Sequence, residues 1–436
     1  MTDRRWLYAL LAICALGLGI RVGYVLGWRD IDTVGGDAYY YHRGANLLAD
    51  GKGFVHPYLY DQGITVPGAD HPPGYILVLA VPSLFGLDGL RAHQITSCLI
   101  GAGTVALVGL LARRVAGPRA GLLAAGFAAI YPNLWFNDAA IMSETLALFL
   151  AVAVSLAAYW TWDDPASVRR WATLGASIGL ASLARAEAAL LIVLLLVPLA
   201  VWAPRMAGWR TRGARAGLAT AAALLVMAPW VVANLIRFEH PSTLSTQMGP
   251  TLEVGNCDLT YHGDLLGAWS PACASEIQDP DRSVLDQVTR DKAFTYMGHH
   301  RSRLPAVIAA RLGRTWGLYA PDSQLQFDVW AEARPIEAAR VGLGMYYLLA
   351  VGSVLGLVAL RRRGVPSFPL TVWLINVAIT VVVFYGSTRF RAPAEPFLVV
   401  LAAAGVEWLL VRRHHEAEVA DVVDEAPVES VSTLSM

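Results

Sequence analysis

The sequence predicts an all-α polytopic membrane protein with about ten transmembrane helices (roughly 8–12). Of the 436 residues, 56% are hydrophobic and only 16% are charged, whereas soluble domains average about 45–50% and about 25%. Apolar runs recur from one end of the chain to the other, and basic residues cluster between them. The formal net charge is zero, so nothing in the overall charge points to a nucleic-acid binder.

The transmembrane prediction depends on apolar runs of sufficient length. We assign them to residues 6–28, 92–112, 120–132, 139–160, 171–183, 186–201, 217–236, 336–360, 366–385 and 396–411. Crossing the hydrocarbon core takes about 20 residues, and fewer where the bilayer is thin. The third, fifth and sixth runs are short, which leaves the number of spans open by about two.

The arginine and lysine clusters predict the orientation. They lie near residues 4–5, 113–119, 169–170, 205–215, 361–363 and 412–413. With ten spans, all of them fall on one side, and the positive-inside rule makes that side cytoplasmic. We therefore expect a multi-pass protein of the cytoplasmic (inner) membrane with both termini in the cytoplasm. The first run is too long for a cleaved signal peptide and lacks a small-residue cleavage site.

This orientation divides the chain into four parts. Residues 1–236 form an N-terminal transmembrane module whose first outer loop spans residues 29–75. Residues 237–335 form a large outer loop, and residues 336–411 form the C-terminal transmembrane helices. Residues 412–436 are acidic and have no apolar face, which predicts a disordered cytoplasmic tail.

The large outer loop carries two further signals. Cys257 and Cys273 both lie in it, and an oxidising compartment would let them pair; the disulfide would close a loop of about 15 residues, worth roughly 3 kcal/mol. Cys14 and Cys98 lie in apolar runs and are expected to be inert. Apolar and basic residues alternate with helical spacing over residues 299–319, which predicts an interfacial helix.

Asp37 is the first candidate for chemistry, because it follows directly after the first span. Residues 37–49 are expected to form a short helix with Tyr40 and Tyr41 on one side, lying flat with the tyrosines at headgroup level. Asp37 could simply cap this helix. Alternatively it is a general base that faces a cavity, with a pKa raised by burial beside apolar helices.

Two further outer segments carry polar groups beside apolar ones. The sequence HPPGYILVLAVPSLFG, which starts at His71, predicts a re-entrant or juxtamembrane helix, and spacing alone favours an incidental surface position for His71. Glu144 lies inside an apolar run, where an acid is costly unless it is paired or faces a wet cavity, so we expect it to be functional. Asp138 is expected to be a solvated helix cap.

Three arginines beside span ends on the predicted outer side are candidates for binding phosphate. Arg185 separates two short spans, and it either binds phosphate or pairs locally with Glu187. Arg389 and Arg391 point the same way if their segment is extended, just before Glu395 starts the last span. Arginines on the outer face run against the inside bias, and a lipid phosphate is the obvious partner.

In order along the chain, these segments resemble the GT-C superfamily of membrane glycosyltransferases. The nearer likeness is to the bacterial branch related to protein O-mannosyltransferases, lipid A aminoarabinose transferases and lipopolysaccharide galacturonosyltransferases. It covers most of residues 1–410. The pieces that carry it are DAYYY from Asp37, HPPGY from His71, SETLALFL from Ser143 and RFRAPAEPF from Arg389.

The resemblance implies a polyprenyl-phosphate-linked sugar donor and inverting transfer on the outer face. It places Asp37 at the catalytic acidic position and Glu144 at the second acidic position. His71 stands where relatives often have Lys or Arg beside the lipid phosphate, and Arg185 matches the basic turn. Ala38 follows the first acid where a second acid is commoner.

We assign the remaining site residues on the same basis. Arg389 and Arg391 join His71 and Arg185 in binding the donor phosphate. Tyr40, Tyr41, Tyr75 and Asp138 are assigned to substrate binding. No metal ligands are assigned, although the resemblance allows for a divalent cation as cofactor.

The predicted function is that of an inverting glycosyltransferase that moves a hexose or pentose from a polyprenyl-phosphate donor to an acceptor hydroxyl. The acceptor partner is a glycolipid, a glycan or a protein, and membrane lipids surround the site. A lipid-linked glycan polymerase or ligase is the nearest alternative. A lipid or sugar transporter is a further alternative, but the chain shows no internal repeat.

Overall fold

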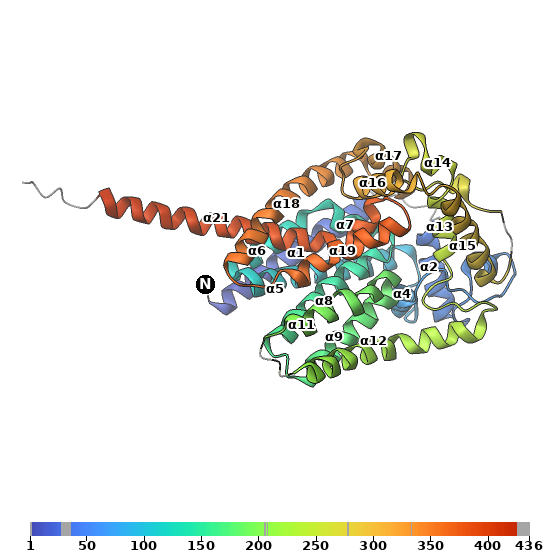
Figure 1. The fold of residues 1–436 in the computed structure, drawn as a ribbon, viewed down its shortest axis with the longest axis horizontal. Coiled ribbons are helices and arrows are strands. Elements are labelled where there is room, and N and C mark those ends of the chain that lie inside the picture. The colour runs from blue at the N-terminus through green and yellow to red at the C-terminus, as the bar shows by residue number, and fades with distance from the viewer. Residues whose placement is uncertain are drawn as a thin grey trace, which may run out of the picture.

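Helices make up almost all of the fold in the computed structural model (Figure 1). The structure describes residues 2–27, 36–204, 206, 208–276, 279–332 and 334–424, with side chains described to residue 412. Within these ranges the β structure amounts to a single isolated bridge between Val55 and Pro67. The all-α fold class predicted from composition is therefore confirmed.

Each of the ten predicted runs lies on a helical segment. These are α1 (Asp3–Gly27), α5 (Leu90–Ala116), α6 (Pro118–Ile130), α8 (Glu144–Asp163), α9 (Val168–Ala184), the series η1 (Ala186–Leu190), α10 (Leu191–Leu194) and α11 (Leu196–Trp202), α12 (Trp209–Arg237), α18 (Ile336–Arg362), α19 (Phe368–Val383) and α21 (Glu395–Asp424). In the described part of the chain, six helices (α1, α5, α8, α12, α18 and α21) are long and apolar enough to cross a membrane. The chain is thus a multi-pass membrane protein, and the number ten stays a prediction.

Small residues let the bundle helices approach closely, as is common in membranes. A Cβ atom added to Gly175 of α9 would lie 2.0 Å from the carbonyl oxygen of Ala219 in α12. One added to Gly356 of α18 would lie 1.9 Å from the carbonyl oxygen of Leu401 in α21. Larger side chains at either glycine would push the paired helices apart.

The remaining helices gather at the end of the bundle opposite the N-terminus (Figure 1). The first loop contributes α2 (Gly36–Ala49), α3 (Pro57–Asp61) and α4 (Gly74–Ser83), and α7 (Pro132–Ala140) follows α6. The segment 237–335 contributes α13 (Met248–Gly255), α14 (Asp258–Tyr261), η2 (Gly263–Leu265), η3 (Pro271–Cys273), α15 (Arg282–His299), α16 (Leu304–Thr315) and α17 (Pro321–Glu332). Two short turns, α20 (Thr388–Arg391) and η4 (Ala392–Ala394), lead into α21.

Helix α2 is less exposed than predicted. Tyr40 and Tyr41 are 4% and 1% exposed and pack against other protein groups, so the prediction of tyrosines at headgroup level is wrong. Helix α4 matches the predicted short helix after the double proline. Its first residue, Gly74, approaches α9 so closely that an added Cβ would lie 2.6 Å from the carbonyl oxygen of Leu183.

The interfacial helix expected at 299–319 is α16, and its basic residues face the protein. Arg311 and Arg314 are buried and donate to backbone carbonyls, including Arg311 Nη1 to Val382 at 2.9 Å and Arg314 Nε to Leu266 at 2.7 Å. The guanidinium groups satisfy carbonyls left free where helices and loops end. Arg311 therefore fastens the outer segment to α19, and Arg314 joins α16 to the η2 turn within the outer segment.

Two further predictions concern the cysteines of the outer segment and the C-terminal tail. Cys257 and Cys273 form a disulfide in the structure. The backbone of α21 continues as a helix to Asp424, although a disordered tail was predicted from residue 412; the Glu, Ala and Val residues there contain no helix breaker before Pro427. Residues 425–436 lie outside the described residues.

Candidate active site

Five polar residues from distant parts of the sequence meet at the end of the bundle opposite the N-terminus. Asp37 begins α2, His71 precedes α4, Glu144 begins α8, Arg185 separates α9 from η1, and Arg389 lies in α20. All five were singled out from the sequence, and the structure brings them together through a continuous series of ion pairs. We call these five residues the charged cluster.

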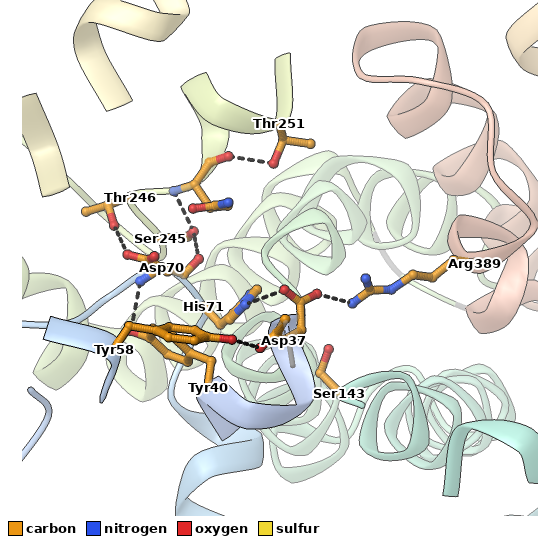
Figure 2. A network of polar contacts seen from close by, with 12 residues as sticks. Asp37, Tyr40, Tyr58, Asp70, His71, Ser143, Ser245, Thr246, Thr251 and Arg389 are labelled. Atoms are coloured by element: carbon orange, nitrogen blue, oxygen red, sulfur yellow. Dashed lines mark hydrogen bonds and ion pairs between the residues drawn. The ribbon is translucent and has the colours of Figure 1, made fainter. Parts of the chain in front are cut away.

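Asp37 is held between two basic groups, as Figure 2 shows. Its Oδ1 lies 3.2 Å from His71 Nε2, and its Oδ2 accepts a hydrogen bond from Arg389 Nη2 at 2.6 Å. Burial by itself would raise the pKa of Asp37, but Arg389 and His71 hold it well below its usual range. The prediction of a raised pKa is therefore wrong, because the sequence did not reveal two basic partners.

Glu144 is the buried centre of the charged cluster. Its carboxylate is fully buried and accepts from two guanidinium groups, Arg389 Nε and Arg185 Nη1, the latter at 2.7 Å. Arg185 also donates from Nε to Glu187 at 2.5 Å, so the local pair considered for it coexists with a contact in the site. Arg389 thus joins both acids, with one nitrogen on Glu144 and another on Asp37.

The aromatic residues of the first loop lie beneath His71. The Tyr41 ring centroid is 4.8 Å from that of His71 and 5.1 Å from that of Tyr75. The Tyr75 hydroxyl is hydrogen-bonded to Ser97 Oγ at 2.6 Å. The Tyr40 hydroxyl accepts a hydrogen bond from the backbone N–H of Asp70 at 3.2 Å. All three tyrosines are buried. Packing around His71 occupies much of their ring surface, and their assignment to substrate binding stays a prediction.

Arg391 does not join the charged cluster. It is 2% exposed, pairs through Nε with Glu395 at 2.6 Å, and lies over the Tyr346 ring at 3.6 Å from the centroid. The segment is helical, so residues two apart face different sides, and the expectation that Arg389 and Arg391 point the same way is wrong.

Asp138 also lies apart from the charged cluster. It is 1% exposed, pairs with Arg21 Nε of α1 at 2.7 Å and accepts from Thr145 Oγ1 at 2.9 Å. The prediction of a solvated cap is wrong because the carboxylate is buried, whereas the assignment of Asp138 to substrate binding stays a prediction. An acid in the apolar bundle is stable here because a buried arginine neutralises it.

One supporting group escaped the sequence reasoning. Asp70 is buried beside His71 and contacts His56 Nε2 at 3.2 Å and Arg282 Nε at 3.4 Å. Burial would raise the pKa of Asp70, but hydrogen bonding to His56 and the charge of Arg282 lower it to about 2. Asp70 therefore ties the start of α15 to the first loop, next to the residue that holds Asp37. Its place directly before His71 was the only sequence signal.

A divalent cation does not match the donor groups of this site. Such an ion needs several oxygen ligands, whereas both oxygens of Asp37 already face basic groups. Within the described ranges, His, Cys, Asp and Glu residues form no group of three or more that could hold a metal ion. The proposed transfer reaction therefore uses no metal ion.

Comparison with known proteins agrees with this architecture. The family model of dolichyl-phosphate-mannose-protein mannosyltransferases matches residues 70–232. No curated protein matches the sequence. The chain spans about half the length of the solved oligosaccharyltransferases it matches.

The structural matches have low sequence identity. The apo oligosaccharyltransferase of Archaeoglobus fulgidus shares 14% identity at a TM-score of 0.56, over 100% of this chain and 53% of that one. The same enzyme tethered to an acceptor peptide shares 15% at 0.58, over 100% and 52%. ArnT from Cupriavidus metallidurans bound to undecaprenyl phosphate shares 14% at 0.45, over 98% and 82%.

These matches bear on the resemblance stated from the sequence. The TM-scores above 0.5 show a shared fold, and the family match covers residues 70–232, which end within α12. The chain therefore has the fold of these oligosaccharyltransferases, and the match of residues 70–232 to a mannosyltransferase family model agrees with the resemblance to the GT-C superfamily.

Proposed function

We propose that this protein transfers a sugar from a polyprenyl-phosphate donor to an acceptor hydroxyl, with inversion, on the outer face of the cytoplasmic membrane. The observation that carries the proposal is the bridge that Arg389 makes between Asp37 and Glu144, with Arg185 on the second acid. A carboxylate and two guanidinium groups then lie at one point, at the end of the bundle where a lipid headgroup would lie. The family match and the dolichol-phosphate complex of the archaeal oligosaccharyltransferase support a lipid-linked donor.

The charged cluster suits a single displacement at the anomeric carbon. Asp37 takes the proton of the acceptor hydroxyl while that oxygen forms a bond to the anomeric carbon. The bond between the anomeric carbon and the phosphate oxygen breaks, and polyprenyl phosphate leaves with the electron pair. Arg389 and Arg185 stabilise the charge that develops on the leaving phosphate. His71 lies beside Asp37 and completes the basic side of the site.

The low pKa of Asp37 implies an order in which the donor and the acceptor are engaged. With Arg389 on its carboxylate, Asp37 is ionised but a weak base. A donor phosphate that draws Arg389 toward itself removes the strongest charge that lowers the pKa of Asp37. We therefore expect the base to gain strength once the donor is bound, so that the acceptor hydroxyl is activated only after the donor has bound.

Lipid analysis of a deletion strain tests the reaction. We expect one polyprenyl-phosphate sugar to accumulate and one glycoconjugate to lose a single type of sugar residue, with both changes reversed by the wild-type chain. A change only in polymer length would instead indicate a lipid-linked polymerase or ligase. Unchanged lipids and glycoconjugates would refute the proposal.

Labelling tests the side of the membrane. Gln62 in the first loop and Arg210 at the other end of the bundle are both exposed. In a background without the free cysteines, a membrane-impermeant maleimide should label Gln62→Cys in intact cells. It should label Arg210→Cys only after permeabilisation. The reverse pattern would place the charged cluster in the cytoplasm and overturn the proposal.

A further inference from the structure

A pocket outside the charged cluster is formed by the outer segment. Its volume is about 350 Å³, within the range of small-molecule sites. Aromatic rings form much of its wall: the Trp269 centroid lies 5.0 Å from that of Phe327 and 6.3 Å from that of Trp330. The other lining residues are Leu265, Ser270, Pro271, Ser323 and Gln326.

The chemistry of the lining indicates a neutral polar ligand. None of the described residues that line the pocket is charged, which disfavours a phosphate or an acidic sugar. Indole and phenyl faces pack against the C–H faces of a pyranose ring, while hydroxyl and amide side chains bond to its hydroxyls. Ser323 and Gln326 are exposed and supply those groups beside the rings. Trp330 is 65% exposed, so its ring is available for such stacking.

A chain of aromatic rings joins the pocket to the charged cluster. The Trp269 centroid lies 6.0 Å from that of Tyr385, and Tyr385 lies 4.9 Å from Phe390. Phe390 directly follows Arg389 in α20, so this series of rings ends at the charged cluster. A ligand that stacks on Trp269 would therefore be linked to the charged cluster through the rings of Tyr385 and Phe390.

The wall that carries Trp269 is held in place before any ligand binds. Trp269 lies within the segment closed by the disulfide of Cys257 and Cys273. Gly267 has a φ of +78°, and a Cβ there would lie 2.7 Å from the Arg311 nitrogen. The Gly267 carbonyl also accepts from the N–H of Gly386 at 2.8 Å. The pocket and the segment between α19 and Arg389 are thus directly connected by a hydrogen bond.

We propose that this pocket, lined by Trp269, Phe327 and Trp330, binds a neutral sugar ring of the acceptor, so that the acceptor is a carbohydrate and not a polypeptide. The acceptor role rests on the proposed glycosyl transfer. Binding of the sugar itself does not, because it needs neither the donor nor Asp37.

The test is direct binding of carbohydrate to the full chain. The protein is placed in lipid nanodiscs, since maltoside detergents would themselves present sugar. The probes are labelled neutral oligosaccharides from the cell envelope of the producing organism. We expect saturable binding that weakens roughly tenfold in Trp330→Ala and is largely kept in Trp330→Phe. The matched control is Trp209→Ala, at a tryptophan 72% exposed at the other end of the bundle, and it should bind as the wild type does.

Three outcomes separate the possibilities. Sugar binding that Asp37→Asn keeps and Trp330→Ala weakens supports the pocket, even if transfer itself is never observed. Absence of binding, or equal binding by Trp330→Ala and the wild type, overturns the pocket and leaves the proposed transfer untouched. Quenching of Trp330 fluorescence by brominated lipids, lost in Trp330→Ala and without sugar binding, assigns the aromatic wall to the bilayer and also overturns it.

Discussion

Replacement of Arg389 by lysine isolates the geometry of the charged cluster from its charge. Arg389 uses Nε for Glu144 and Nη2 for Asp37, the latter at 2.6 Å. A lysine keeps the positive charge but has one nitrogen on a flexible stem, so it cannot reproduce the planar fork. One charge-assisted hydrogen bond is lost in the resting site, and one contact to the leaving phosphate is lost in the transition state.

The size of the effect follows from those contacts. A hydrogen bond to a charged group contributes about 1.5–3 kcal/mol, which corresponds to a roughly 10- to 150-fold loss of transfer. The assay is restoration of the missing sugar residue in the deletion strain, measured as an initial rate by mass spectrometry at matched protein levels. The matched control is Arg43→Lys, since Arg43 pairs with Asp61 at 2.8 Å in a partly exposed pair of the same outer region.

Surface pairs of that kind contribute about 0–1 kcal/mol, so Arg43→Lys should transfer within a few-fold of wild type. Equal rates for Arg389→Lys and the wild type would refute the bridging role of Arg389. An equal loss in Arg43→Lys would show that the assay reports general damage to the outer region.

Three further predictions concern Arg389, the Arg21–Asp138 pair and the disulfide. In Arg389→Gln the pKa of Asp37 should rise, because a charge that lowers it is gone. The base works only above its pKa, so transfer by this variant should begin to fall at a higher pH than transfer by the wild type. Comparing the two pH–rate profiles between about pH 7 and pH 5 checks this. Arg21→Met leaves the Asp138 carboxylate buried without its partner, so thermal unfolding in nanodiscs should show a loss of about 3–5 kcal/mol, whereas an unchanged melting temperature would contradict the buried pair. Cys257→Ser should destabilise the outer segment by roughly 3 kcal/mol, while serine at the partly exposed free Cys14 should have little effect on the same melting curve; equal shifts would argue against the disulfide.

The sequence was informative where an energetic rule singles out a residue. Glu144 and Arg185 stand out because charge in or beside an apolar run is costly without a partner, and Asp37 stands out because it follows a span. These residues, with Arg389 and His71, meet in the structure. Their partners could not be deduced, because ion pairs over such sequence distances depend on how the helices pack.

The errors have the same origin. Burial does act to raise the pKa of Asp37, but two basic groups from distant segments, Arg389 and His71, reverse the direction, so the predicted rise is wrong. Arg391 was grouped with Arg389 on the assumption of an extended chain, whereas one helical turn sends it to Glu395. The tyrosines were read as amphipathic side chains at an interface, yet the first loop folds back over them. Local patterns identified the candidate groups, and tertiary packing decided which of them face each other.

The central claim is that the carboxylate at the start of α2 accepts the proton of the attacking hydroxyl. Replacing Asp37 by asparagine keeps the shape of the side chain and removes the base. The account predicts a loss of transfer of about 10²–10⁴-fold in a protein that still folds and still binds the polyprenyl-phosphate donor. Transfer at the wild-type rate by Asp37→Asn would contradict it.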